Sequence, residues 1–144
     1  MRKQVITMHL ITCLDDSNGM LFNKRRQSQD GLVREDILNN LQDSKLWMNS
    51  YSAGQFKDFS AYSISIDDNF MSKASERDYC FAENISLAPY LNDISSLILY
   101  YWNRKYPADR YFDIDLSDWE LKNTTEFAGN SHEKITKKIY LPKK

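Results

Sequence analysis

Residues 96–102, SLILYYW, form the longest strongly apolar run of the chain. The run is far shorter than the roughly 20 residues that a membrane-spanning helix needs. Because every position from 97 to 102 is apolar, we expect a central β-strand that is covered on both faces. The segments on either side of this strand indicate what kind of sheet contains it.

Strand-type and helical segments alternate before this run. Residues 5–14 (VITMHLITCL) are typical of a buried strand and end in the turn-forming residues 15–19 (DDSNG). Residues 32–41 carry apolar side chains at i, i+4 and i+8, which predicts a helix with Asp30 as its N-cap. Further short strands are predicted, with helical turns between them, at residues 45–49, 62–66 and 79–82.

The last third of the chain has a different pattern. Residues 119–127 and 133–141 are β-prone and are separated by a polar connection, which predicts an antiparallel hairpin. Strands that alternate with helices and are followed by a hairpin indicate an α/β fold with a mixed sheet flanked by helices. A length of 144 residues is normal for one hydrophobic core, so we expect residues 1–144 to form a single domain.

Charge, the first residues and the cysteines indicate the partners and the cellular compartment that we expect for this protein. Nineteen basic against twenty acidic residues leave a net charge of −1, so we expect no nucleic acid and no membrane as partner. Residues 1–7 are basic, but no long apolar region follows, so no signal peptide is predicted. Cys13 and Cys80 lie in apolar segments and are expected to be reduced thiols of a cytoplasmic protein.

Neither metal nor serine chemistry has a local motif. The two histidines, His9 and His132, lie far apart in the chain and no cysteine pair has zinc spacing, so we expect no metal site. His9 is expected to be a structural histidine inside a strand. Ser131, His132 and Glu133 are adjacent, and neighbouring side chains of an extended segment point to opposite faces, so they predict a connection rather than a relay.

Charged residues cluster around the end of the first strand. Lys24, Arg25 and Arg26 precede the predicted helix and present cationic groups to an anion, or else form a solvated basic loop. In α/β sheets, strand ends and helix starts converge on one cleft, so Asp15 and Asp16 are expected to face Glu35 and Asp36. A half-buried carboxyl group there would act as a proton donor.

The order of these segments resembles the dihydrofolate reductase family. Residues 16–20 (DSNGM) look like the end of its first strand and the mobile loop over its active site, and residues 46–51 (LWMNSY) take the place of its I-M-G-R-x-T segment. Residues 108–115 and 117–121 (SDWEL) are similar to its G-D-x-x-F-P and S-x-W-E-L segments. The resemblance implies that family's fold. It also implies an active-site acid with possible counterparts in Asp30, Glu35 and Asp36, of which Asp36 is the closest in sequence context.

Two departures from the family concern its cofactor, NADPH. The Gly-Gly turn that brings the family's backbone close to the cofactor's phosphates is replaced by Glu83 and Asn84. The family's Gly-Arg pair is replaced by Asn49 and Ser50, which removes a phosphate-binding arginine. The resemblance therefore implies the family's fold without its standard NADPH contacts.

A second resemblance is to small uncharacterised bacterial proteins, some of which are labelled ribonuclease Z. It rests on residues 15–30 and 127–134. The H-x-H-x-D-H motif of that enzyme is absent, and two histidines cannot fill a two-zinc site, so we do not expect ribonuclease Z chemistry.

Three functional hypotheses follow from the sequence. The leading hypothesis is a cleft that binds a small anionic metabolite without the standard NADPH contacts. The first alternative is an NADPH-dependent reductase with a variant cofactor site and Asp36 as catalytic proton donor. The second is a homodimeric interaction protein that pairs through a sheet edge or an aromatic patch. The candidate ligand-binding residues are Asp15, Asp16, Asn18, Met20, Asn23, Lys24, Arg25, Arg26 and Asp30.

Overall fold

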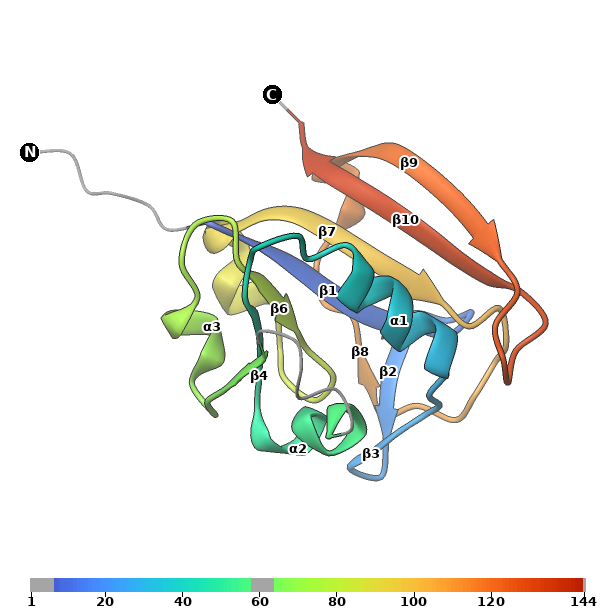
Figure 1. Cartoon of the computed structure of the whole chain (residues 1–144). Coiled ribbons are helices and arrows are strands. Elements are labelled where there is room, and N and C mark those ends of the chain that lie inside the picture. Colours follow the sequence, from blue (N-terminus) through green and yellow to red (C-terminus); the bar gives the residue numbers. More distant parts are fainter. Residues whose placement is uncertain (1–6, 58–63, 144) are drawn as a thin grey trace, which may run out of the picture.

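A seven-stranded mixed sheet runs through the computed structural model, which describes residues 7–57 and 64–143 (Figure 1). The strand order is β5-β4-β6-β1-β7-β10-β9. β1 pairs in parallel with β6 and β7, whereas β10 is antiparallel to β7 and β9. The strands are β1 (Met8–Leu14), β4 (Leu46–Met48), β5 (Ile64–Ile66), β6 (Tyr79–Phe81), β7 (Ile94–Tyr101), β9 (Trp119–Phe127) and β10 (Ile135–Pro142). The predicted mixed α/β sheet with a C-terminal hairpin is confirmed.

The strand predicted from SLILYYW is a central one, since β7 lies between β1 and β10. It begins at Ile94, two residues earlier than predicted. The predicted strands at 5–14 and 62–66 correspond to β1 and β5, while residues 5, 6, 62 and 63 lie outside the described part of the chain.

The helix predicted before β4 is present as α1 (Gly31–Asn39). Asp30 is its N-cap, as predicted, and accepts a hydrogen bond from the backbone N–H of Leu32. The remaining helical segments are short: α2 (Ser50–Ala53), η1 (Gly54–Phe56), α3 (Phe70–Lys73), η2 (Ala88–Asp93) and η3 (Leu116–Asp118).

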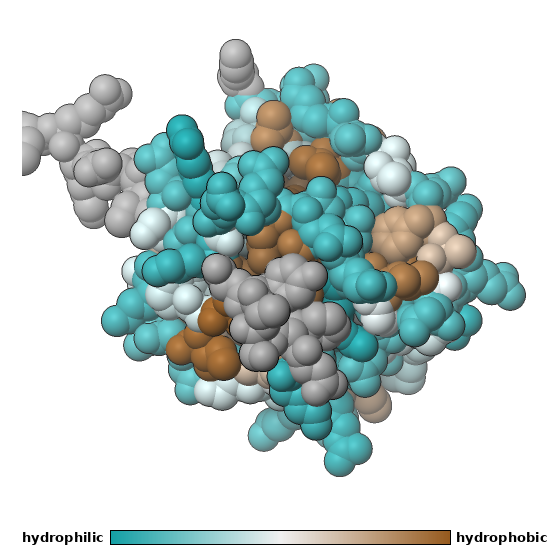
Figure 2. All heavy atoms as spheres, in the orientation of Figure 1, coloured by the Kyte–Doolittle hydropathy of each residue, from teal (hydrophilic) through white to brown (hydrophobic). Residues whose placement is uncertain are grey.

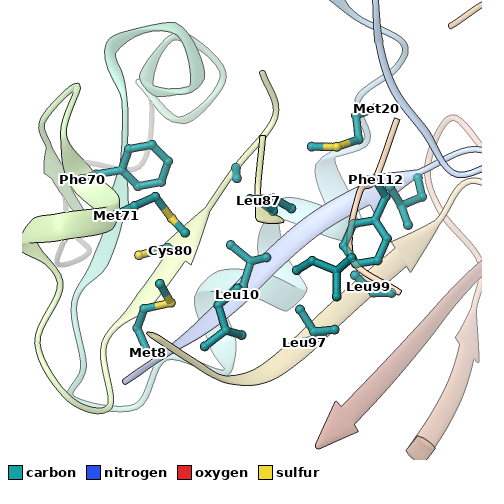
Figure 3. Close-up of a cluster of buried hydrophobic side chains, with 14 of the residues drawn as sticks. Met8, Leu10, Met20, Phe70, Met71, Cys80, Leu87, Leu97, Leu99 and Phe112 are labelled. Atoms are coloured by element: carbon teal, nitrogen blue, oxygen red, sulfur yellow. The ribbon is translucent and has the colours of Figure 1, made fainter. Parts of the chain in front are cut away.

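The sheet separates two apolar clusters because successive side chains of a strand point to opposite faces. Leu10 and Leu14 of β1 belong to one cluster, to which α3 contributes Phe70 and Met71. Figure 3 shows Leu10, Phe70 and Met71 in this cluster. Ile11 of β1 belongs to the other cluster, which α1 covers with apolar side chains that include Val33, Ile37 and Leu38. The core thus fixes α1 against the end of the sheet where the charged residues lie.

A second, three-stranded sheet projects from the end of β1 (Figure 1). It consists of β2 (Gly19–Phe22), β3 (Arg25–Arg26) and β8 (Arg110–Tyr111) in the order β3-β2-β8. The sequence offered a solvated basic loop as one interpretation of Lys24, Arg25 and Arg26, but Arg25 and Arg26 form strand β3. Its strand character comes from pairing with β2, which in turn pairs with the distant β8, and local sequence patterns do not record such pairing.

Hydrophilic side chains cover most of the face in Figure 2, with apolar side chains in small separate groups. No helix among the described residues is long and apolar enough to cross a membrane.

Candidate functional site

The charged residues gather where β1 and β6 end and the small sheet begins. β1 lies between two parallel neighbours that come from different parts of the chain, with β6 on one side and β7 on the other. In open α/β sheets, ligands bind outside the carboxyl ends of the strands at such a reversal of strand order. A ligand-binding site is therefore expected at this edge of the sheet.

Asp15 is the buried centre of this edge. Its carboxylate accepts hydrogen bonds from the backbone N–H groups of Ser17 at 2.8 Å, Gly19 at 2.7 Å and Tyr106 at 3.1 Å, and from Nε2 of Gln27 at 3.1 Å. Gly19 makes this packing possible, because a Cβ there would lie 2.6 Å from that of Ala108. Asp15 was predicted to bind ligand, but the structure commits its oxygens to holding loops together.

Four other predicted ligand residues shape the same region through their backbone. Asp16 is exposed and its N–H donates to the carbonyl of Arg104. Met20 is buried in the core, and Asn18 and Asn23 adopt left-handed φ angles of 63° and 53° at turns. Asp16 and Asn18 thus belong to the turn between β1 and β2, Met20 anchors β2 in the core, and Asn23 lies in the β2–β3 turn.

The three predicted cations do not converge on one point. Lys24 lines a pocket of about 480 Å³. Its other lining residues are Leu21, Tyr51, Asn84, Asp109 and Arg110. Arg25 and Arg26 line a different pocket of about 290 Å³. Its other lining residues are Phe22, Asn23, Gln27, Tyr106 and Pro107. We call these the Lys24 pocket and the Arg25 pocket.

Arg26 is engaged by a buried acid. Its Nε lies 2.9 Å from Oε2 of Glu83, its Nη2 lies 3.2 Å from Oε1, and its guanidinium stacks over the ring of Tyr51 at 4.6 Å. Burial lowers the pKa of Arg26, but the hydrogen bond and charge of Glu83 outweigh this and raise it. Gln55 also donates to Glu83, so this network ties β3 to α2, η1 and the end of β6.

Glu83 also tests whether the family's cofactor fits this chain. By the resemblance found in the sequence, it takes the place of the first glycine of the family's Gly-Gly turn. It is buried, with only 7% of its surface exposed. The Glu83 side chain occupies space that a glycine leaves open, and its pairing with Arg26 also takes up that cation. The residues present therefore do not fit NADPH in the family's manner.

Asp36, the predicted proton donor, points toward β7 and β10. Its Oδ2 accepts hydrogen bonds from the hydroxyl of Tyr100 at 2.5 Å and from Nζ of Lys137 at 2.8 Å. Burial and the charge of Asp36 raise the pKa of Tyr100, so its hydroxyl stays protonated and donates. No contact among the described residues joins Asp36 to Asp15. Glu35 is exposed on α1, and no contact of the described residues joins it to Asp15 either.

A cluster that sequence patterns missed surrounds His132, in the turn between β9 and β10. Nδ1 of His132 lies 3.0 Å from Oδ2 of Asp30, while Nε2 lies 2.9 Å from Oγ of Ser28 and 3.2 Å from the hydroxyl of Tyr106. The indole of Trp102 stacks on the imidazole at 4.6 Å. The sequence predicted that residues 131–133 form no relay with one another. It gave no sign of the partners of His132 that lie far away in the chain.

Asp30 is more than a helix cap, because it also holds the β9–β10 turn. It accepts hydrogen bonds from the backbone N–H groups of Leu32, Asn130 and Ser131. Burial raises its pKa, but the hydrogen bonds from His132 and these backbone groups outweigh burial and hold the pKa well below its ordinary value. Gly129 permits the close approach, since a Cβ there would overlap the carboxylate of Asp30.

No group of three or more His, Cys, Asp or Glu side chains among the described residues is arranged to hold a metal ion. His9 instead contacts Ser96, with Nδ1 2.6 Å from Oγ, which agrees with a structural histidine.

Comparisons with known proteins support the fold. No protein-family model matches the chain, and no curated protein does. Among solved structures, dihydrofolate reductase from Enterococcus faecalis, complexed with NADP(H) and RAB-propyl, matches with a TM-score of 0.66 over 96% of this chain and 97% of that one. Sequence identity is 9%, so the likeness extends to the fold alone. The resemblance found in the sequence is confirmed at that level: the chain has a dihydrofolate-reductase-like fold.

Proposed function

We propose that this protein binds a small anionic metabolite in the Lys24 pocket, without the NADPH contacts of dihydrofolate reductase. The observation that carries the proposal is that Lys24 and Arg110 line the same pocket. Neither cation has an ion pair among the described residues, so both charges are available to a ligand. A volume of about 480 Å³ suits a small metabolite.

The other lining residues narrow the chemistry of the ligand. Tyr51 and Asn84 supply hydrogen-bonding groups beside the two cations. Asp109 accepts the N–H of Asn23 through Oδ2, and its negative charge favours a donor on the ligand. We therefore expect a metabolite with a phosphate or carboxylate group for Lys24 and Arg110 and a hydroxyl or amino group near Asp109.

Thermal denaturation with added anions tests this proposal. Wild-type protein is heated with inorganic pyrophosphate, citrate or NADPH, beside the double variant Lys24→Asn/Arg110→Gln. Asparagine suits position 24 because the backbone there has a left-handed φ of 62°. A ligand at 100 times its Kd adds about 2.7 kcal/mol, so we expect pyrophosphate or citrate to raise the Tm of the wild type by several degrees.

The matched control is Arg25→Gln, which removes an exposed cation of the same hairpin that lines the other pocket. This variant should keep the shift that the double variant loses. A shift with NADPH alone would contradict the proposal and favour the reductase alternative. A Tm that responds to protein concentration and to none of these anions would favour the homodimer alternative.

A further inference from the structure

We propose that Ser28, His132 and Asp30 form a nucleophilic relay that cleaves small carboxylic esters beside the Arg25 pocket. The two hydrogen bonds of such a relay are present in series. Oγ of Ser28 lies 2.9 Å from Nε2 of His132, and Nδ1 of the same ring lies 3.0 Å from Oδ2 of Asp30. This is the order of contacts by which a base activates a serine and an acid orients the base.

Asp30 determines which nitrogen of His132 carries the proton. The buried carboxylate accepts hydrogen bonds from the backbone N–H of Leu32 in α1 and from those of Asn130 and Ser131 in the β9–β10 turn. These hydrogen bonds favour the ionised form of Asp30. An ionised carboxylate can only accept, so Nδ1 of His132 carries hydrogen, and in the neutral form of the ring the lone pair of Nε2 faces Ser28. Asp30 is thus a positioning residue, and His132 is the base.

The ring of His132 is held in this orientation from several sides. Trp102 stacks on one face at 4.6 Å, and only 1% of the His132 side chain is exposed. A catalytic base needs such packing, because a misplaced ring loses the alignment of the proton transfer.

The relay adjoins the Arg25 pocket through Tyr106, which lines that pocket and contacts His132. Gln27, the residue before Ser28, lines the pocket as well, and Ser28 itself is partly exposed. Without substrate, the hydroxyl of Tyr106 lies 3.2 Å from Nε2 of His132 and shares its lone pair with Ser28. When an ester is bound, this hydroxyl is close enough to turn and donate to a carbonyl oxygen that gains charge near Ser28. Arg25 on the same pocket favours an ester that carries a negative group.

The chemistry balances with water as the second substrate. Oγ of Ser28 attacks the acyl carbon while its proton passes to Nε2 of His132, and the carbon–oxygen bond to the alcohol breaks as the alcohol takes that proton. Water then attacks the acyl carbon, gives one proton to Nε2 and releases the carboxylic acid as Oγ recovers the proton. The proposal is separate from anion binding in the Lys24 pocket, because the two pockets have no lining residue in common.

Covalent labelling of the full chain tests the relay. Diisopropyl fluorophosphate is added to folded protein, and adducts are located by intact mass and peptide mapping. We expect one adduct, on Ser28, with release of fluoride. With p-nitrophenyl acetate, an acid quench while ester remains should show one acetyl group on the same residue, which is lost once the ester is consumed. Labelling should disappear in Ser28→Ala and should persist in Ser17→Ala, which changes an exposed serine near the same edge.

The role of the base is tested by rates. His132→Asn should slow labelling of Ser28 by about 100-fold. Asp30→Asn should also slow the labelling of Ser28, measured in protein that circular dichroism shows to be folded. The same variant should move the pH at which the labelling rate is half-maximal. Because either variant can lose stability, the wild type is also labelled in concentrated urea, where Ser28 should no longer react faster than other serines. No adduct on Ser28, or equal labelling in folded and unfolded chains, overturns the relay.

Discussion

Asp15 and Asp30 are both fully buried aspartates near the same end of the sheet, yet they have different partners. Asp15 accepts only from neutral groups, namely three backbone N–H groups and the amide of Gln27. Asp30 also accepts three backbone N–H groups, but it shares Oδ2 with the imidazole of His132. The two residues show that one type of buried carboxylate can close a turn or orient a titratable ring.

The difference also lies in which segments each carboxylate joins. Asp15 holds the turn that follows its own strand, together with Gln27 and the backbone of Tyr106. Asp30 joins the start of α1 to the β9–β10 turn, two segments that are about a hundred residues apart. Loss of Asp15 should therefore damage the fold itself, whereas loss of Asp30 should detach a turn and disturb His132.

The largest effect is expected from Asp15→Ala. This change removes the acceptor of the buried N–H of Gly19 and of three partly buried donors, although Nε2 of Gln27 keeps the carbonyl of Pro107. Each donor left unsatisfied costs about 1–3 kcal/mol before relaxation. We expect the free energy of unfolding to fall by about 3–5 kcal/mol, measured by urea denaturation. A fall below about 1 kcal/mol would show that water replaces Asp15 and that its burial matters little.

Gly129→Ala tests the Asp30 side of the comparison. The new Cβ would overlap the carboxylate of Asp30, so the β9–β10 turn must move away, with an expected loss of about 1–3 kcal/mol. The matched control is Gly54→Ala, where nothing lies within 4 Å of the new Cβ and the φ of −59° suits alanine. We expect the control to raise stability by about 0.4–1 kcal/mol in the same urea experiment.

Acid should distinguish the wild type from Asp30→Asn. The pKa of Asp30 is lower in the folded state than its ordinary value, so the stability that it contributes is present above that value and is lost as pH falls. We expect the wild type to lose about 1 kcal/mol through Asp30 between pH 5 and pH 3, and Asp30→Asn to have a flatter acid limb. Urea midpoints across this range provide the measurement, and parallel curves would contradict the prediction.

The smallest effect is expected at an exposed carboxylate. Glu126 pairs with Lys134 at 3.2 Å, and more than half of each side chain is exposed. Glu126→Gln should change stability by less than about 0.5 kcal/mol, because exposed ion pairs are screened and mobile. This variant gives the effect of removing an exposed carboxylate, with which the effects at the buried Asp15 and Asp30 are compared. A larger change would mean that burial does not explain why Asp15 and Asp30 matter more than Glu126.

Much of the main sheet followed from local pattern. The uniform apolar run of β7, the N-cap at Asp30 and the β9–β10 hairpin were all predicted, because each depends on residues a few positions apart. The order of the segments was enough to indicate a dihydrofolate-reductase-like fold, which the likeness to a solved structure confirms at 9% identity. Strand β3 was missed, because only pairing with β2 gives those two residues strand geometry.

The candidate sites depended on contacts that no local pattern records. The sequence identified Lys24 but not Arg110, because β8 meets β2 only through the small sheet. The sequence placed Asp30 at a helix cap and His132 in a connection, and no pattern indicated that these two residues meet each other or Ser28. Hydrophobic periodicity and capping act over a few residues, so the sequence by itself determined the elements. Which polar side chains face one another depends on strand order and on the approach of distant turns, so only the tertiary structure decided the sites.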